Sequence, residues 1–109
     1  MRASRDQPAM VVIVFRARLR PDADMQSIGR MGERMLELAS AMPGYVSYKG
    51  FSAADGENVT VVEFESLEAL ARWREHPEHK EVQERGRRDF FASYSVQVCT
   101  LVRESRFPS

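Results

Sequence analysis

The pattern of apolar positions predicts a β-strand near the start of the chain. Residues 10–20 (MVVIVFRARLR) are rich in valine and contain neither glycine nor proline, as is typical of strands. Residues 11–15 are apolar at every position, whereas residues 15–20 alternate between apolar side chains and arginines. A strand with one face in solvent alternates throughout, so the pattern predicts that the first half of this strand is buried on both faces.

A long amphipathic helix is predicted next. Six apolar residues recur at steps of three and four between Met25 and Met42, which places them on one face of a helix of about five turns. The acidic residues just before Met25 can accept hydrogen bonds from the free N–H groups at the helix start. Pro43–Gly44 is expected to end the helix, and the methionines of the stripe are expected to fill the core.

A second helical region is predicted to begin at Ser66, whose hydroxyl can cap free backbone N–H groups. His76–Pro77 interrupts it, and proline is favoured at the first position of a helix. A short further helical segment is therefore expected over residues 77–90, with His79 and Val82 on one face.

Three more strands complete the predicted elements. Residues 45–54 and 58–65 flank the turn at Asp55–Gly56 and are typical of a hairpin, and residues 93–103 form the last strand. Gly50 is expected to mark a bulge or a close approach of the backbone. The order βαββαβ predicts the α+β class and a ferredoxin-like fold, a four-stranded antiparallel sheet with helices on one face.

The predicted sheet leaves one apolar face without a cover. Right-handed crossovers put both helical connections on the same side of the sheet, yet the first strand is apolar on both sides and the last carries Cys99 and Leu101 opposite its valines. Because an exposed face of this kind is rare in soluble monomers, we expect a homodimer that pairs two sheets as a dimeric α+β barrel. The alternative is that a loop or the C-terminal tail covers this face.

Length and composition indicate one domain and limit its partners. The chain has 109 residues, with a predicted domain over residues 10–104 between a disordered tail (1–9) and a C-terminal tail (105–109). Sixteen basic residues balance sixteen acidic ones, so neither nucleic acid nor a membrane is an expected partner. The single cysteine is typical of a reducing compartment, which predicts a cytoplasmic protein.

Two segments carry a resemblance to a known family. The stretch VVEFESLEALARWREHPEHKEVQERGRRDFF and the closing strand YSVQV, in the order βαββαβ, resemble the antibiotic-biosynthesis-monooxygenase-like proteins over residues 10–103. That family contains cofactor-free oxygenases of polyketide quinols, quinol monooxygenases, haem-degrading oxygenases and many proteins without known activity. The resemblance implies a cavity between helices and sheet, bordered by a helical tryptophan near a histidine.

The same resemblance argues against haem and other cofactors. Haem-degrading members pair a tryptophan with a histidine ten residues later and with an asparagine in the first strand. Here Gln83 stands ten residues after Trp73, and Arg16 occupies the first strand where asparagine would be expected. His76 and His79 have the spacing of a metal pair but no evident third ligand. We therefore expect neither a cofactor nor a metal.

Trp73 and His79 are the predicted catalytic residues. Trp73 can stack on a planar aromatic substrate, and the alternative is that it pins its helix to the sheet. His79 can take a proton from a phenol or hydroquinone near neutral pH, and the alternative is a hydrogen-bonded histidine at the edge of the core. His76 is expected to be a helix cap.

Arg16, Tyr94 and Tyr48 are the predicted substrate-binding residues. Arg16 can hold an anionic substrate, although ion pairing at the interface is the favoured interpretation for it and for Arg18. The tyrosines can donate hydrogen bonds into a cavity, and the alternative is packing with a solvated hydroxyl.

The sequence thus predicts a cofactor-independent monooxygenase that acts on an aromatic or quinol-type small molecule. The alternative is a non-catalytic small-ligand-binding or stress-related dimeric module of the same fold, because fold alone does not decide function. An isomerase of the muconolactone type also fits the topology. An open pocket touching Trp73 and His79 would favour an enzyme, whereas a filled helix–sheet interface would favour a structural role.

Overall fold

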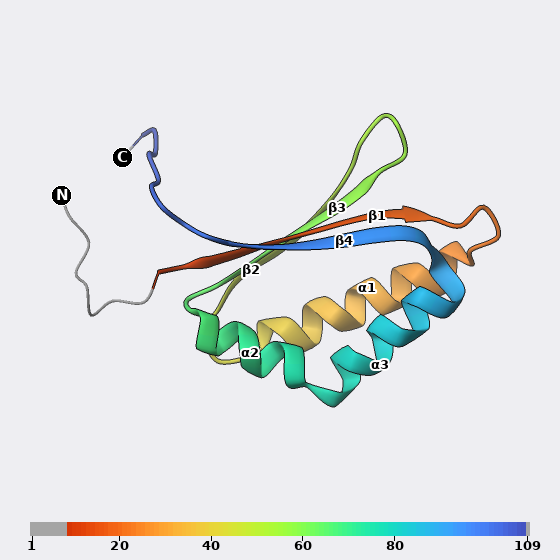
Figure 1. Ribbon diagram of the computed structural model, residues 1–109, viewed down its shortest axis with the longest axis horizontal. Coiled ribbons are helices and arrows are strands. Elements are labelled where there is room, and N and C mark those ends of the chain that lie inside the picture. The colour runs from red at the N-terminus through yellow and green to blue at the C-terminus, as the bar shows by residue number, and fades with distance from the viewer. Residues whose placement is uncertain (1–8, 109) are drawn as a thin grey trace.

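The computed structural model describes residues 9–108 and has the predicted ferredoxin-like α+β fold (Figure 1). Apart from Ala9, the predicted N-terminal tail lies outside the described residues, as does Ser109. The elements are β1 (Val11–Leu19), α1 (Met25–Ser40), β2 (Tyr45–Ser52), β3 (Asn58–Phe64), α2 (Leu67–Glu75), α3 (Pro77–Arg85) and β4 (Phe91–Thr100).

The four strands form one antiparallel sheet in the order β2-β3-β1-β4. β1 lies at its centre, and Val11 pairs with Phe64 of β3 and with Thr100 of β4. The bulge expected at Gly50 is instead at the start of β2, where the register shifts between Tyr45 and Ser47. A Cβ atom at Gly50 would have no neighbour within 4 Å, so the expected close approach of the backbone is also wrong.

The helices begin where the sequence predicts. The Asp24 carboxylate accepts from the backbone N–H groups of Gln26 and Ser27, and Ser66 Oγ accepts from that of Ala69 at 3.1 Å. His76 caps α3, because its Nδ1 accepts from the backbone N–H of Glu78 at 3.1 Å. These local hydrogen bonds satisfy donors that every helix start leaves free.

The second helical region extends to Phe90 as predicted, but its last turn has a different geometry. α3 ends at Arg85, and a π-helical turn over Gly86–Phe90 leads directly into β4, which begins at Phe91. This turn is tight, because a Cβ atom at Gly86 would lie 2.6 Å from Cε2 of Phe91. The absence of a side chain at Gly86 lets the Phe91 ring pack directly against the backbone of the turn.

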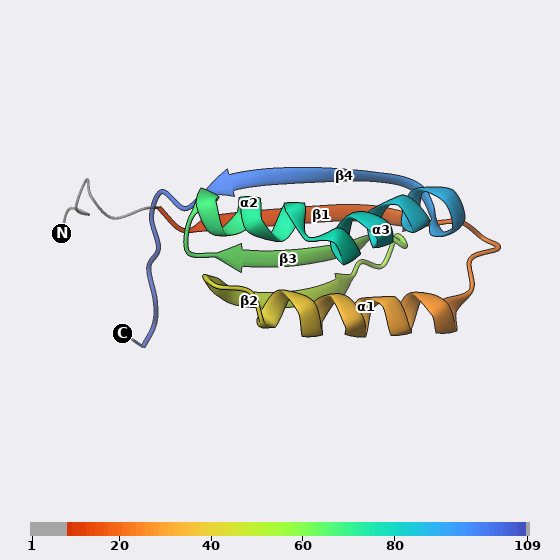
Figure 2. The same ribbon diagram turned by 90° about the horizontal axis from the view of Figure 1, so that it is seen from below.

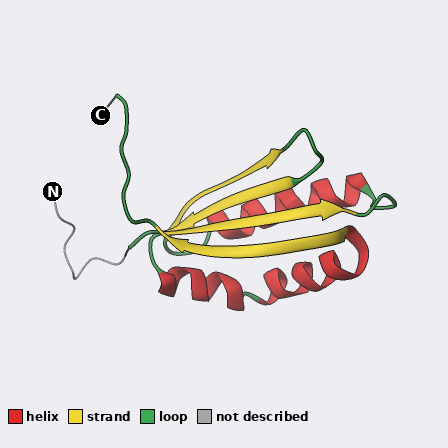
Figure 3. Ribbon diagram, turned by 45° about the horizontal axis from the view of Figure 1, so that its top comes forward, coloured by secondary structure: helices red, strands yellow, loops and turns green. Residues whose placement is uncertain are grey.

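All helices cover the same face of the sheet (Figures 1 and 3). Alternation along β1 turns Val11, Ile13 and Ala17, all buried, toward the helices. Val12 and Val14 lie on the opposite face and are half-buried although no helix covers them. No helix among residues 9–108 has the length and apolar character needed to cross a membrane.

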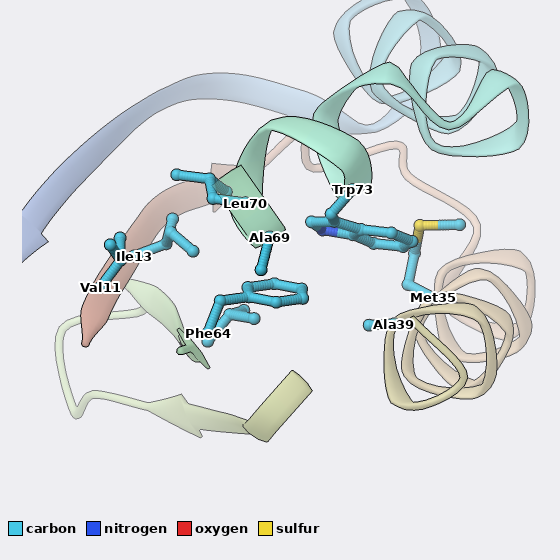
Figure 4. Packing of buried hydrophobic residues seen from close by; sticks show 9 residues of the cluster. Val11, Ile13, Met35, Ala39, Phe64, Ala69, Leu70 and Trp73 are labelled. Atoms are coloured by element: carbon cyan, nitrogen blue, oxygen red, sulfur yellow. The ribbon is translucent and has the colours of Figure 1, made fainter. Parts of the chain in front are cut away.

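The core is concentrated at one end of the helix–sheet interface (Figure 4). Val11 and Phe64 are fully buried there, beneath Trp73 of α2 and Met35 of α1. The remaining core members come from the same elements: Ile13, Ala39, Val62, Ala69 and Leu70. Toward the other end of the strands the same two layers enclose a cavity.

Candidate active site

A large cavity lies between the helices and the sheet. Its volume is about 610 Å³, within the range of pockets that hold a drug-sized organic ligand. All four strands line one side of the cavity, and α1, α2 and α3 line the other. Figure 2 shows these three helices lying across the sheet. Val96 and Val98 of β4 belong to its wall and remain 47% and 46% exposed, so this wall reaches solvent.

Trp73 and His79 form one aromatic surface of this cavity. Trp73 lies in the last turn of α2 and His79 in the first turns of α3. The interruption of the helix at His76–Pro77 brings the two side chains together. The centroids of their rings are 4.3 Å apart, with 32° between the ring planes. Trp73 is 4% exposed and also packs in the core, so pinning the helix and lining the cavity are roles of the same side chain.

The His79 imidazole is uncharged at neutral pH. Burial, together with the nearby His76 and Arg74, lowers its pKa from 6.5 to about 4, although an interaction with the Arg74 main chain opposes the shift. Its Nδ1 is buried and has no hydrogen-bond partner among the described residues. A buried polar nitrogen without a partner, on a residue that lines a cavity, is a candidate for a functional role.

We expect the pKa shift of His79 to appear as acid sensitivity of the fold. Above pH 6.5 the His79 ring is neutral in both the folded and the unfolded chain. Between pH 6.5 and about 4 the ring is protonated in the unfolded chain but stays neutral in the folded chain, so acid favours unfolding. A pKa shift of this size corresponds to a free energy of about 3 kcal/mol. Because solvent still reaches part of the ring, the effect on stability is smaller than this value. The free energy of unfolding should therefore fall by about 2 kcal/mol over this range.

Urea unfolding of the wild type and of His79→Gln at several pH values measures this loss. His79→Gln lacks the titrating ring and should lose about 2 kcal/mol less than the wild type between pH 6.5 and 4. His76→Gln removes one of the groups that lower the pKa of His79, so its loss of stability should lie between those of His79→Gln and the wild type. Parallel pH profiles for the wild type and His79→Gln would contradict the assigned burial.

Tyr48 and Tyr94 line the same cavity as Trp73 and His79. Burial, together with Tyr45, raises the pKa of Tyr48, so its hydroxyl stays a donor. Tyr94 is 39% exposed and stacks on Phe15, with 5.4 Å between ring centroids. Phe91 completes this second aromatic cluster, at 5.4 Å from Phe15 and 5.8 Å from Tyr94.

Arg16 lies on the other face of the sheet from these four residues. It follows Phe15 in β1 and therefore points away from the cavity. Its guanidinium donates two hydrogen bonds to the Glu57 carboxylate, at 3.1 and 3.0 Å. Arg18, on the same face, pairs with Asp55 at 3.0 Å. Both arginines thus tie β1 to the hairpin between β2 and β3.

The cavity also contains polar residues that the sequence analysis did not single out. Ser52 Oγ donates to the Asn58 side-chain oxygen at 2.8 Å, across the register of β2 and β3. This bond leaves the Asn58 amide N–H groups as donors at the hairpin end of the cavity. Arg74, next to Trp73, also lines the wall. Asn58 and Arg74 do not belong to a recognisable sequence motif. Asn58 reaches the cavity through the register of β2 and β3.

The methionine stripe of α1 differs from its expected role. Met35 is buried in the core, at 6% exposure, but Met25 is 64% exposed. Met25, Met31 and Met35 all line the cavity. Flexible, polarisable thioethers in a ligand-facing wall adapt to ligands of different shape. The stripe is therefore a cavity wall as much as core filling.

No group of three or more His, Cys, Asp or Glu side chains within residues 9–108 is placed to hold a metal ion. Nδ1 of His76 is already engaged as the cap of α3. His76 is therefore a cap, as predicted.

Fold and site together define a class: small α+β proteins in which one aromatic-lined cavity lies between the helices and one face of an antiparallel sheet. Residues 10–85 match the model of the family described as antibiotic biosynthesis monooxygenase. The chain belongs to this family, as its sequence predicts.

One relative is similar in sequence, and two solved structures share the fold. YqjZ of Bacillus subtilis (strain 168), an uncharacterised protein, is 37% identical over 79 residues, which cover 72% of this chain and 69% of YqjZ. Rv0793 of Mycobacterium tuberculosis is 24% identical with a TM-score of 0.79, covering 90% of this chain and all of Rv0793. SnoaB of Streptomyces nogalater, a cofactor-independent oxygenase, is 14% identical with a TM-score of 0.74, covering 93% of this chain and 99% of SnoaB.

Proposed function

We propose that this protein is a cofactor-independent monooxygenase that oxidises an electron-rich phenol or hydroquinone with O₂. The observation that carries the proposal is the pair of Trp73 and His79 in the wall of a cavity of about 610 Å³, with the imidazole Nδ1 unpaired. Membership of the monooxygenase family and the fold shared with SnoaB support it.

The protein's part in the reaction is to position the substrate and to hold its proton. A planar ring stacked on Trp73 presents its hydroxyl to the imidazole of His79, which can accept the proton because the ring is neutral. The imidazolium that forms is stabilised by the phenolate beside it. The apolar walls exclude water, and the hydroxyl of Tyr48 and the amide of Asn58 can donate to oxygens of the substrate.

The phenolate then reduces O₂ without help from another redox group. One electron passes from the anion to O₂, and the resulting radical pair combines to form a C–O bond and a peroxide. The O–O bond breaks with loss of one water, which leaves a carbonyl on the ring. For an anthrone the balance is one anthrone and one O₂ giving one anthraquinone and one H₂O.

We also infer that the working unit is a homodimer joined through the open sheet face. Val12, Val14, Val59 and Val61 lie on this face by strand register and are only half-buried. Phe51, also on this face by register, is 52% exposed. A second copy would bury these side chains and form the dimeric barrel. The single free cysteine supports a cytoplasmic location for this dimer.

Oxygen uptake with a panel of anthrones and hydroquinones tests the proposed activity. His79→Ala should lower kcat about 100-fold, because a positioned proton acceptor contributes at least that much. Trp73→Phe keeps an aromatic ring and should lower kcat/KM about tenfold through lost stacking. Lys80→Ala, on the same helix as His79 but outside the cavity wall, is the matched control and should retain activity.

The outcome separates an enzyme from a binding module. Uptake that is unaffected by both changes would remove Trp73 and His79 from the mechanism. Binding of aromatic ligands without any oxygen uptake would show a non-catalytic module of the same fold instead.

A further inference from the structure

The cavity wall is unusual in its charges. Among the described residues that line it there is no aspartate, no glutamate and no lysine, and Arg74 supplies the one formal charge. The chain as a whole is balanced, with sixteen acidic and sixteen basic residues. The charge of the cavity wall therefore differs from that of the whole chain, because the fold places one basic residue and no acidic residue there.

Arg74 is not committed to an ion pair within residues 9–108. The ion pairs of this part of the chain occupy other arginines: Arg16, Arg18, Arg20, Arg34, Arg88 and Arg106. Arg74 sits in the last turn of α2, directly after Trp73. Arg74 is solvent-exposed and also lines the cavity, so it lies at the rim, where its guanidinium can pair with a charged group of a ligand.

The positive charge of Arg74 lies close to the pair formed by Trp73 and His79. It is one of the groups that lower the pKa of His79, so the cation lies within electrostatic range of that imidazole. A second positive charge on His79 is thereby disfavoured, whereas a negative charge on a ligand is favoured. A guanidinium is well suited to this task, because its planar fork of donors matches a carboxylate.

We propose that the cavity selects aromatic substrates that carry a carboxylate, with Arg74 pairing with the carboxylate while the ring stacks on Trp73. This rests on the proposed function only in taking the cavity as the substrate site. Arg74 is a specificity-determining residue in this arrangement. A substrate with a positive substituent at the same place would be excluded.

Two probes of nearly the same shape test the preference. 1-Hydroxy-2-naphthoate carries the carboxylate beside a phenol, and 1-naphthol lacks it. Isothermal titration calorimetry gives their Kd values, and quenching of Trp73, the one tryptophan of the chain, shows that each probe occupies the cavity. We expect the carboxylate to tighten binding about tenfold, the effect of one charge-assisted pair near solvent.

Variants assign the preference to one side chain. Arg74→Gln should bind both probes with equal affinity, and Arg74→Lys, which keeps the charge, should retain most of the preference. Arg72→Gln is the matched control, because Arg72 lies on the same helix but not in the cavity wall. In the unmodified protein, raising NaCl from about 20 to about 500 mM should weaken the naphthoate selectively.

The results distinguish this inference from the proposed activity. Equal affinities of the wild type for both probes, or a preference that Arg74→Gln leaves intact, would overturn the role of Arg74 even if oxygen is consumed. A tenfold preference lost in Arg74→Gln supports that role even if neither compound is oxidised, in which case only the oxygenase proposal fails.

Discussion

Replacing Val14 by glutamate is expected to dissociate the protein into single chains at micromolar concentration. Val14 lies in the central strand, on the sheet face that no helix covers. In the proposed dimer a glutamate there would be buried without a partner, at a cost of about 3–5 kcal/mol. The Kd of the dimer should therefore rise at least 100-fold, by about 1.4 kcal/mol for each factor of ten.

Size-exclusion chromatography with light scattering measures this change directly. The wild type should have the mass of two chains and Val14→Glu that of one, with circular dichroism showing whether the sheet survives. Leu36→Glu, at a 41% exposed position on α1, introduces the same charge elsewhere and should leave the dimer intact. A monomeric wild type, or an unchanged mass for Val14→Glu, would refute the sheet-to-sheet dimer.

Gly44→Ala is expected to lower the free energy of unfolding by about 3 kcal/mol. Gly44 joins α1 to β2 at φ +83°, where any other residue is strained by about 1 kcal/mol or more. A Cβ atom there would also lie 2.5 Å from Cβ of Ala69, which is 2% exposed in α2. Relieving that overlap requires α2 to move off the sheet, at a cost of about 1–3 kcal/mol.

Urea unfolding at a fixed protein concentration can separate the loss due to the positive φ of Gly44 from the loss due to the overlap with Ala69. Gly29→Ala is the matched control, because a Cβ atom at this α1 position meets nothing within 4 Å. It should stabilise the helix by up to about 1 kcal/mol. Ala69→Gly alone should cost about 1 kcal/mol of helix propensity. Adding Gly44→Ala to Ala69→Gly should then cost only the part due to φ, because the overlap is absent. Similar stabilities of Gly44→Ala and Gly29→Ala would contradict this account.

The elements of this fold were predictable because their signals are local. The density of β-branched residues specifies β1, and the caps at Asp24, Ser66 and His76 act within three residues of each helix start. The end of α3 was not predictable in the same way. It depends on the contact between Gly86 and Phe91, which exists only once β4 has folded back.

The candidate site was predictable in type but only partly in membership. A tryptophan and a histidine around a helix break are visible in the sequence, and Tyr48 and Tyr94 join them in the cavity. Alternation in β1 already contained the information that Arg16 opposes Phe15, which faces the cavity. What alternation could not reveal is which face the helices cover, because β1 is apolar on both.

Arg74 and Asn58 were beyond reach of the sequence for a different reason. Charged and amide side chains next to apolar ones are common on solvent-exposed helices and hairpins. Their importance comes from three-dimensional placement. Arg74 lies at the end of α2, just before the helix break that places His79 against Trp73, and the strand register sets Asn58 opposite Ser52. Neither arrangement leaves a motif.

The central position of β1 has a consequence for how the chain is made. Within this domain β1 is synthesised before the other strands and needs both neighbours, and Val11 finds one of them only at Thr100, in the last strand of the sheet. Until β4 has been made, the nascent chain carries its most apolar strand with an open hydrogen-bonding edge. The sheet can therefore close only after β4 has been synthesised, and nascent chains that stall before β4 should be prone to aggregate.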